Sequence, residues 1–204
     1  MSPVADTKSR IHDAALDLFL EHGVRQTSMR KIAEAVGITA PALYRHYKNK
    51  AEIFIEIMMD CFREFTHYLA KGLKKRTPRT RLQAIGEQYA QFVIDHPREY
   101  RMMFLTEWGD ELQPLHEEGQ DETWQSYQFL VDRVAEMQQT GELTDALDSE
   151  HIAHAIWSVV HGQAALYLHM GETMGLSENA FRFAFHSAVR SLVRGYHPKV
   201  YQAD

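Results

Sequence analysis

The sequence predicts an all-α protein of about nine helices, in which a three-helix head precedes a larger helical domain. Apolar residues recur at helical spacing in nearly every stretch of the chain, and no run of alternating residues requires a β-strand. Glycine, proline or capping residues separate the stretches. With 204 residues, of which 45% are hydrophobic and 25% charged, the chain can enclose an apolar core and is not mainly disordered.

The first three predicted helices are short and closely spaced. Apolar residues within 7–22 form one helical stripe, and a glycine follows it. A second helix is expected to begin after Ser28, a favourable N-cap, and to end at Gly37. Thr39 can cap a third helix with Pro41 in its first turn, where the missing N–H costs no hydrogen bond.

Longer helices are expected in the rest of the chain. Asn49-Lys50-Ala51-Glu52 has the pattern of a capping box and opens a helix that runs to the basic stretch 74–76. A less regular section contains Gly109, Pro114 and Gly119. The remaining helices are expected at residues 82–94, 97–105, 123–139, 149–170 and 177–196.

Charge is divided unevenly along the chain. Residues 1–81 contain 15 Lys+Arg and 9 Asp+Glu, a net of +6, whereas residues 82–204 contain 7 and 19, a net of -12. A positive segment on a negative body favours a protein that meets a polyanion at one end, although a solvated surface can have the same composition. The single cysteine excludes an intramolecular disulfide and is expected to be buried.

Nothing in the sequence predicts a membrane protein. The opening residues lack the apolar core of a signal peptide, so we expect a cytoplasmic protein. The most apolar long stretch, residues 152–170, contains three histidines, which favours a buried helix over a membrane span.

The two short helices and the turn within residues 28–47 have the spacing of a helix-turn-helix, in which the first helix braces the second across the DNA backbone. The second helix would read the major groove. Its small residues let the backbone approach base edges, and Thr39 and Tyr44 offer hydroxyl groups. Tyr44 is expected to point outward and Tyr47 into the core. Lys48, at the start of the next helix, suits a phosphate.

One set of residues makes this interpretation more specific: Ile11, Ala14-Ala15, Phe19, Gly23, Thr27-Ser28, Ile32-Ala33, Val36-Gly37-Ile38, Leu43-Tyr44-Arg45-His46-Tyr47 and Lys50. In order and spacing, this set resembles the DNA-binding region of the TetR family of transcriptional regulators. The resemblance covers residues 11–57 and implies DNA contacts at Arg30, Thr39, Ala40, Pro41, Ala42, Tyr44, His46 and Lys50. It also implies that the C-terminal helices form a ligand chamber and a dimer interface. Trp157 with His161-Gly162 is similar to a Trp/His-Gly signature of one C-terminal subgroup.

The last two predicted helices are apolar on more than one face, so one face can line the core while the other contacts a second chain. We expect a two-fold homodimer through a four-helix interface. Its expected residues are Ile152, Ile156, Val160, Tyr167, Phe181, Phe185, Ala188 and Leu192. Two heads would bind half-sites roughly 34 to 36 Å apart, or a multiple of this distance, in a near-palindromic operator of double-stranded DNA.

The middle of the chain is rich in aromatic and methionine side chains. Any one of them is more often a core residue, but some are expected to line a pocket, because ligand sites are mostly apolar with a few polar groups. We therefore expect a small hydrophobic or aromatic effector. The candidate residues are Tyr89, Phe92, Met103, Trp108, Trp124, Tyr127, Gln128, Trp157 and His161.

Other chemistries have weaker support. His151, His154 and His161 can share a helix face, but no cysteine or carboxylate completes a metal-binding motif. Ser158 lies one turn before His161, which leaves a helical hydrolase as a remote alternative, although no nucleophile elbow surrounds the serine. We expect no catalytic residues, no metal and no cofactor.

Together these observations predict a ligand-responsive transcriptional regulator, with repression as its expected action. Residues 1–49 are expected to form the helix-turn-helix domain, residues 50–78 a connecting helix, and residues 79–204 the ligand-binding and dimerisation domain. A DNA-binding protein without a small-molecule effector remains the alternative.

Overall fold

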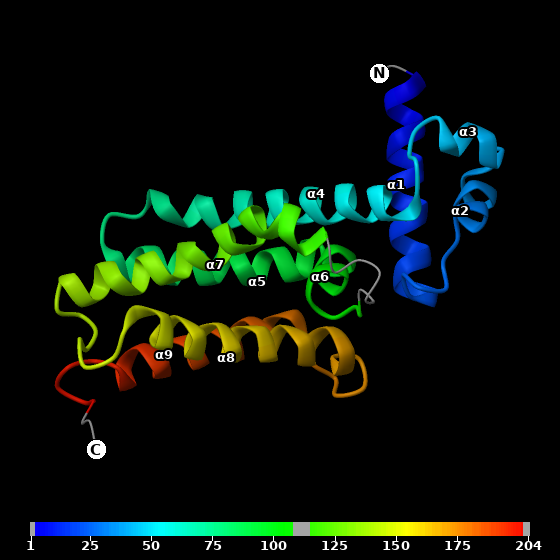
Figure 1. Ribbon diagram of the computed structural model, residues 1–204. Helices are drawn as coiled ribbons and strands as arrows, with labels where there is room; N and C mark the ends of the chain where they lie inside the picture. The colour runs from blue at the N-terminus through cyan, green and yellow to red at the C-terminus, as the bar shows by residue number, and fades with distance from the viewer. Residues whose placement is uncertain (1–2, 108–114, 202–204) are drawn as a thin grey trace. The chain divides into compact units, whose positions relative to one another are not determined.

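The computed structural model describes the backbone of residues 3–107 and 115–201, and the side chains of residues 7–107 and 125–201. Every regular element in these ranges is helical, which confirms the predicted fold class (Figure 1). The elements are α1 (Pro3–His22), α2 (Met29–Val36), α3 (Ala40–Tyr44), α4 (Lys50–Lys71), the 3₁₀ helix η1 (Gly72–Lys74), α5 (Pro78–Asp95), α6 (Pro97–Phe104), α7 (Leu115–Gln139), α8 (Ser149–Met170) and α9 (Glu178–Gly195).

Three helices, α1, α5 and α7, begin earlier than the sequence pattern predicts. Helix α5 begins at Pro78 because Thr77 caps it: the Thr77 hydroxyl accepts the Thr80 N–H, and the Thr80 hydroxyl accepts the Thr77 N–H. The usual partner in such a box is Glu or Gln, so the pattern gave no signal here. Helix α7 begins at Leu115 and includes Gly119. One internal glycine costs a helix only about 1 kcal/mol relative to alanine.

The helices pack into two compact units. The first comprises residues 1–63 with 98–123, and the second comprises residues 64–97 with 124–204. Helix α4 contributes residues to both units. Only His96 separates α5 from α6, yet α5 belongs to the second unit and all of α6 except Pro97 belongs to the first. The units follow contacts between helices, whereas the division expected at residues 49 and 78 follows the order of the chain.

The core of the first unit is built from α1, α2, α3 and the beginning of α4. The rings of Phe19 and Phe54 meet edge to face with their centres 6.0 Å apart. Several large side chains have no exposed surface: Ile11, Phe19, Ile32, Leu43 and Ile57. Short helices depend on such burial because their own hydrogen bonds are few.

Cys61 is buried in the first unit, as expected. Burial and the nearby carboxylates of Glu99 and Asp60 raise the pKa of its thiol to about 12. The thiol therefore stays protonated near neutral pH and lacks the thiolate that a redox sensor needs.

The second unit packs α5 against η1, α8 and α9. Aromatic rings fill its centre: Phe65 lies 5.3 Å from Tyr89 and 5.0 Å from Phe92, and Tyr89 lies 5.7 Å from Phe185, between ring centres. In the part of the chain that the structure describes, no helix combines the length and apolar character of a membrane span.

Gly72 marks a close approach between η1 and α5. A Cβ atom at this position would lie 2.6 Å from the backbone nitrogen of Ile85 and 2.7 Å from its Cγ1 atom. Because the backbone of α5 cannot swing aside, Gly72→Ala must displace η1. We expect this change to lower the free energy of unfolding by about 1 to 3 kcal/mol, measured by urea denaturation.

Gly86→Ala is the matched control, since Gly86 lies inside α5 and its added Cβ would make an ordinary contact of 3.6 Å with the Phe185 ring. Alanine favours a helix over glycine by about 0.5 to 1 kcal/mol, so this variant should be at least as stable as the parent. Equal stability of the parent and Gly72→Ala would contradict the close packing.

Candidate nucleic-acid interface

Helix α2 has a capping residue at each end. Ser28, in an extended conformation (φ -117°, ψ 156°), accepts the N–H of Lys31 through its side chain at 3.3 Å. At the other end Gly37 is left-handed (φ 74°, ψ 33°), and its N–H donates to Glu34 at 3.1 Å. A glycine reaches this conformation without strain, so it lets the chain turn sharply after α2.

Helix α3 follows this turn and has only five residues. The Thr39 hydroxyl accepts the N–H of Ala42 at 3.3 Å, which confirms the predicted cap. The helix ends at Tyr44. Beyond it, the N–H groups of His46 and Tyr47 both donate to the carbonyl of Leu43, at 2.9 Å and 3.1 Å. The segment expected to read DNA is therefore a short helix followed by a tight turn.

The two tyrosines of this segment face opposite environments. Tyr44 is 54% exposed and Tyr47 only 3%, which confirms the predicted orientations. Arg45, which directly follows Tyr44, is also exposed and was missing from the expected contacts. The other expected contacts here are exposed or half-buried: Thr39, Ala40, Pro41, Ala42 and His46. Together they form a small, mostly uncharged surface at the position where contacts to DNA are expected.

Arg30 and Lys48 supply exposed positive charge beside this surface. The Arg30 side chain is 84% exposed and its Nε donates to Glu34 at 2.8 Å; the Lys48 side chain is 89% exposed, with its ammonium 3.6 Å from Glu52. Exposed pairs of this kind contribute little to stability, because water and salt screen the two charges. Both side chains therefore remain accessible to solvent and only weakly paired.

Lys50 has a different environment from the one expected of a phosphate contact. Its ammonium donates to the carbonyl oxygen of Val24 at 2.6 Å and to that of Arg25 at 3.3 Å. Both carbonyls lie in the turn between α1 and α2. In this structure, Lys50 fastens the beginning of α4 to that turn.

Two more side chains fasten the same region. The Thr27 hydroxyl is buried and lies within donating distance of the carbonyls of Gly23, at 2.9 Å, and Leu18, at 3.1 Å. The guanidinium of Arg10 on α1 donates to the carbonyl of Val36 at the end of α2. Terminal carbonyls of a helix lack intrahelical donors, so such bonds stabilise the helix ends.

The start of α4 is capped nearly as predicted. The Asn49 side chain accepts the N–H of Glu52 at 2.9 Å. The Glu52 carboxylate accepts the N–H of Lys48 at 2.6 Å. In a standard capping box it would accept the N–H of the N-cap residue, Asn49, one position later.

Tyr47 joins α1 to α4. The ammonium of Lys8 lies 5.1 Å from the centre of the Tyr47 ring and 3.0 Å from the Glu56 carboxylate. Burial raises the pKa of Tyr47, and the carboxylates of Glu56 and Asp60 raise it further. The phenol therefore stays neutral and can donate its hydrogen bond to Glu56.

The residues expected to line an effector pocket lie in several places. Tyr89 and Phe92 are buried in the aromatic core of the second unit, and Met103 is buried in the first unit. Trp108 and the side chain of Trp124 lie outside the described part of the chain. The structure thus places the first three in packing positions.

Three other candidates form one cluster. The Trp157 ring lies 5.9 Å from Tyr127 and 5.4 Å from His161, between ring centres. Burial lowers the pKa of His161, so its imidazole is neutral near pH 7. Gln128 is exposed and donates to Asp132 at 2.8 Å.

Across the described residues, no group of three or more His, Cys, Asp or Glu side chains is arranged to hold a metal.

The residues expected at a dimer interface require a correction. Five of them belong to the core of the single chain, because each is at most 5% exposed and has almost no surface left for a partner: Ile152, Ile156, Val160, Phe181 and Phe185. Tyr167, whose ring stacks on Phe181 at 4.3 Å, is half-buried, and so are Ala188 and Leu192.

Different side chains of α8 and α9 are exposed and apolar. Phe183 is 78% exposed, Leu166 49% and Met170 45%. The sequence shows two apolar faces on each helix, and only packing decides which of them the chain itself buries.

These helices and the exposed α3 define a DNA-binding regulator of the helix-turn-helix class. Residues 11–57 match the family model described as bacterial regulatory proteins, tetR family. Residues 82–192, more than half of the chain, match the model described as tetracyclin repressor-like, C-terminal domain. The chain belongs to the TetR family of transcriptional regulators. Such regulators are not enzymes, so the hydrolase alternative is set aside.

Individual relatives agree with this assignment. The chain is 25% identical over 179 residues to the HTH-type transcriptional regulator TtgR of Pseudomonas putida, covering 84% of each. Its fold matches a tetR-family regulatory protein from Rhodococcus RHA1 with a TM-score of 0.77 at 20% identity over the full length of both chains. It also matches the ketosteroid transcriptional regulator KstR2 of Mycobacterium tuberculosis with a TM-score of 0.73 at 19% identity, covering 93% of this chain and 94% of that one.

The contacts of Lys50 predict the effect of removing its ammonium. Lys50→Met keeps most of the aliphatic stem but leaves the carbonyls of Val24 and Arg25 without this donor. Since hydrogen bonds to charged groups contribute about 1.5 to 3 kcal/mol, we expect a loss of that size in the free energy of unfolding, measured by urea denaturation.

Lys48→Met is the matched control, because the Lys48 side chain is almost fully exposed. Its stability should stay within about 0.5 kcal/mol of the parent. Equal losses in the two variants would contradict the structural role of Lys50.

Proposed function

We propose that this TetR-family protein is a ligand-responsive repressor. As a homodimer it occupies a near-palindromic operator in double-stranded DNA, and it leaves the operator when a small hydrophobic or aromatic effector binds the C-terminal half. DNA binding is supported chiefly by the exposed surface of α3 around Tyr44. The buried side chains of Leu43 and Tyr47 hold this surface in place.

The proposed contacts divide by chemistry. The small side chains of Ala40 and Ala42 allow α3 to approach base edges, and Tyr44 can bond a base or a phosphate. Arg30 and Lys48, exposed and weakly paired, contact phosphates and supply affinity that depends on salt. Because operator DNA is the proposed partner, we expect the protein to work in the compartment that holds the chromosome.

A homodimer is supported by the exposed apolar side chains of α8 and α9. Phe183, Leu166 and Met170 would otherwise remain in water, and large exposed apolar groups of this kind are typical of interaction surfaces. A two-fold interface built from these two helices would bring two reading helices to one operator.

Effector control is supported by the cluster of Tyr127, Trp157 and His161, which offers aromatic surface and one neutral imidazole. Helix α4 contributes residues to both units. It can therefore transmit effector binding as a change in the distance between the two DNA-binding domains of the dimer. Helix α6, joined to α5 through one residue, is fastened to α1 by Arg98, which lies 2.7 Å from the Asp17 carboxylate.

The DNA interface is tested by selecting bound sequences from random duplexes. We expect an inverted repeat with half-sites roughly 34 to 36 Å apart or a multiple of it. Tyr44→Ala should weaken binding by about 5- to 150-fold, which corresponds to about 1 to 3 kcal/mol. Lys48→Ala should reduce the salt slope of binding by about 1. Lys199→Ala, an exposed lysine of the second unit, is the control. Failure to enrich any inverted repeat at modest ionic strength would refute the proposal.

Effector control makes a reciprocal prediction. If an effector lowers operator affinity by a given factor, then saturating operator DNA must lower effector affinity by the same factor. Calorimetric titration of the effector with and without operator measures this factor. Equal effector affinity in both titrations would reject this form of control, and operator binding indifferent to every small molecule tested would favour the effector-free alternative.

A further inference from the structure

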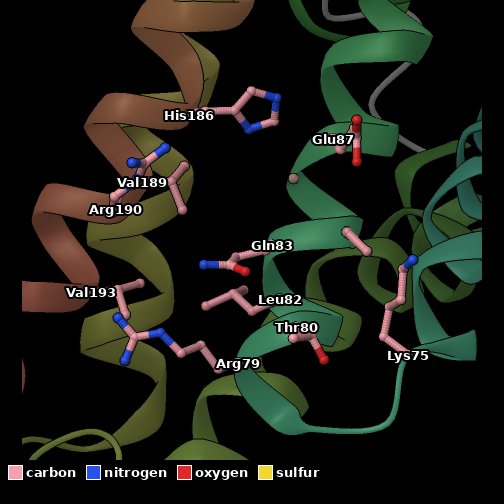
Figure 2. Close-up of a pocket in the computed structure, with 12 residues that line it drawn as sticks. Lys75, Arg79, Thr80, Leu82, Gln83, Glu87, His186, Val189, Arg190 and Val193 are labelled. Carbon is pink, nitrogen blue, oxygen red and sulfur yellow. The ribbon is translucent and has the colours of Figure 1, made fainter.

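A cavity of about 590 Å³ lies in the second unit, between the first half of α5 and the second half of α9 (Figure 2). This volume is in the range of small-molecule sites, which span roughly 300 to 1,000 Å³. The cavity shares no lining residue with the Tyr127, Trp157 and His161 cluster.

The floor of this α5–α9 groove is apolar. Leu82 from α5 and Val189 and Val193 from α9 line it, and each is at most 7% exposed. Gly86 also lines the groove, and its missing side chain leaves space beside the Phe185 ring. Such a floor can accommodate a hydrocarbon group but offers it no hydrogen bond.

The walls of the groove are polar and mainly basic. Lys75, Arg79 and Arg190 line it together with His186, and Glu87 supplies a single carboxylate. Figure 2 shows the Arg79 side chain extending from the start of α5 toward α9, and His186 extending from α9 toward α5. The permanent charges of the lining therefore sum to a positive value.

The three permanent cations of the lining differ from neighbouring arginines in their pairing. Within the described residues, Lys75, Arg79 and Arg190 make no ion pair and no side-chain hydrogen bond. Two arginines on the same helices behave differently: Arg81 pairs with Glu136, and Arg182 lies 2.9 Å from Glu178. Unpaired guanidinium groups beside a concave site are suited to carboxylate or phosphate oxygens.

We propose that the α5–α9 groove binds a small amphipathic organic anion, such as an aliphatic carboxylate or an alkyl phosphate. The anionic oxygens contact the guanidinium groups of Arg79 and Arg190, and the hydrocarbon part lies on Leu82, Val189 and Val193. The basic walls disfavour a cation, and a neutral apolar molecule would gain nothing from the unpaired guanidinium groups. The site depends on neither DNA binding nor the proposed effector response.

Isothermal titration calorimetry of the full chain tests the ligand class. The probes are octanoate, octyl phosphate, 1-octanol, octylammonium and inorganic phosphate. We expect octanoate or octyl phosphate, or both, to bind at least about tenfold more tightly than the neutral and cationic probes. Comparison of the two anions distinguishes a carboxylate from a phosphate head group. Octanol binding as tightly as both anions, or inorganic phosphate as tightly as octyl phosphate, would overturn the proposal, as would no binding by either organic anion.

Variants test the location. Gln83 is exposed and lines the groove, so Gln83→Glu adds a repelling carboxylate without disturbing the core. This variant and the Arg79→Gln/Arg190→Gln double variant should each bind the anion at least about tenfold more weakly. Arg194→Gln, an exposed position on α9 outside the lining, is the matched control and should bind like the parent.

Circular dichroism confirms that each variant folds, and sedimentation equilibrium reports its oligomeric state. Anion binding unchanged in both groove variants would locate the bound anion elsewhere and overturn the proposal. A double variant that loses its self-association while it still binds the anion would show that the groove holds a second copy of the chain instead.

Discussion

A helix of five residues does not persist in water by itself, because nucleating a helix costs more free energy than one turn of hydrogen bonds returns. Helix α3, the proposed reader of DNA, is such a helix. It is kept in shape by the Thr39 cap, by the fully buried Leu43 and by the buried Tyr47 that follows it. Because Leu43 and Tyr47 are used for packing, the exposed Tyr44 can be presented at a fixed place.

The positive charge of the N-terminal region serves two purposes that net charge does not separate. Arg10 and Lys50 donate to backbone carbonyls at helix ends and turns, where intrahelical donors are missing. Arg30 and Lys48 remain exposed and only weakly paired. A basic region can therefore owe part of its charge to folding and part to DNA, and the partner of each charged group, a backbone carbonyl or an exposed carboxylate, distinguishes the two.

The second unit separates packing from binding in a similar way. Rings of Phe65, Tyr89 and Phe92 fill its centre, and a cavity lies away from these rings, between α5 and α9, beside Val189 and Val193. A regulator of this construction responds to a ligand only if the ligand binds its two shapes with different affinity. A change of shape in one unit can reach the other along the backbone, through the continuous helix α4 and through the single residue between α5 and α6.

Local sequence patterns predict most of the helices, the turn at Gly37, the cap at Thr39 and the outward position of Tyr44, because capping and helical periodicity act over a few neighbouring residues. They also predict the family, because the apolar, glycine and capping residues of 11–57 have the order and spacing of the TetR DNA-binding region. Three features follow instead from tertiary packing: Lys50 donates to the carbonyl of Val24, Ile152 and its neighbours line the core of one chain, and unpaired cations from different segments line the α5–α9 groove. These outcomes depend on which surfaces meet between residues far apart in the chain, and no local pattern records that.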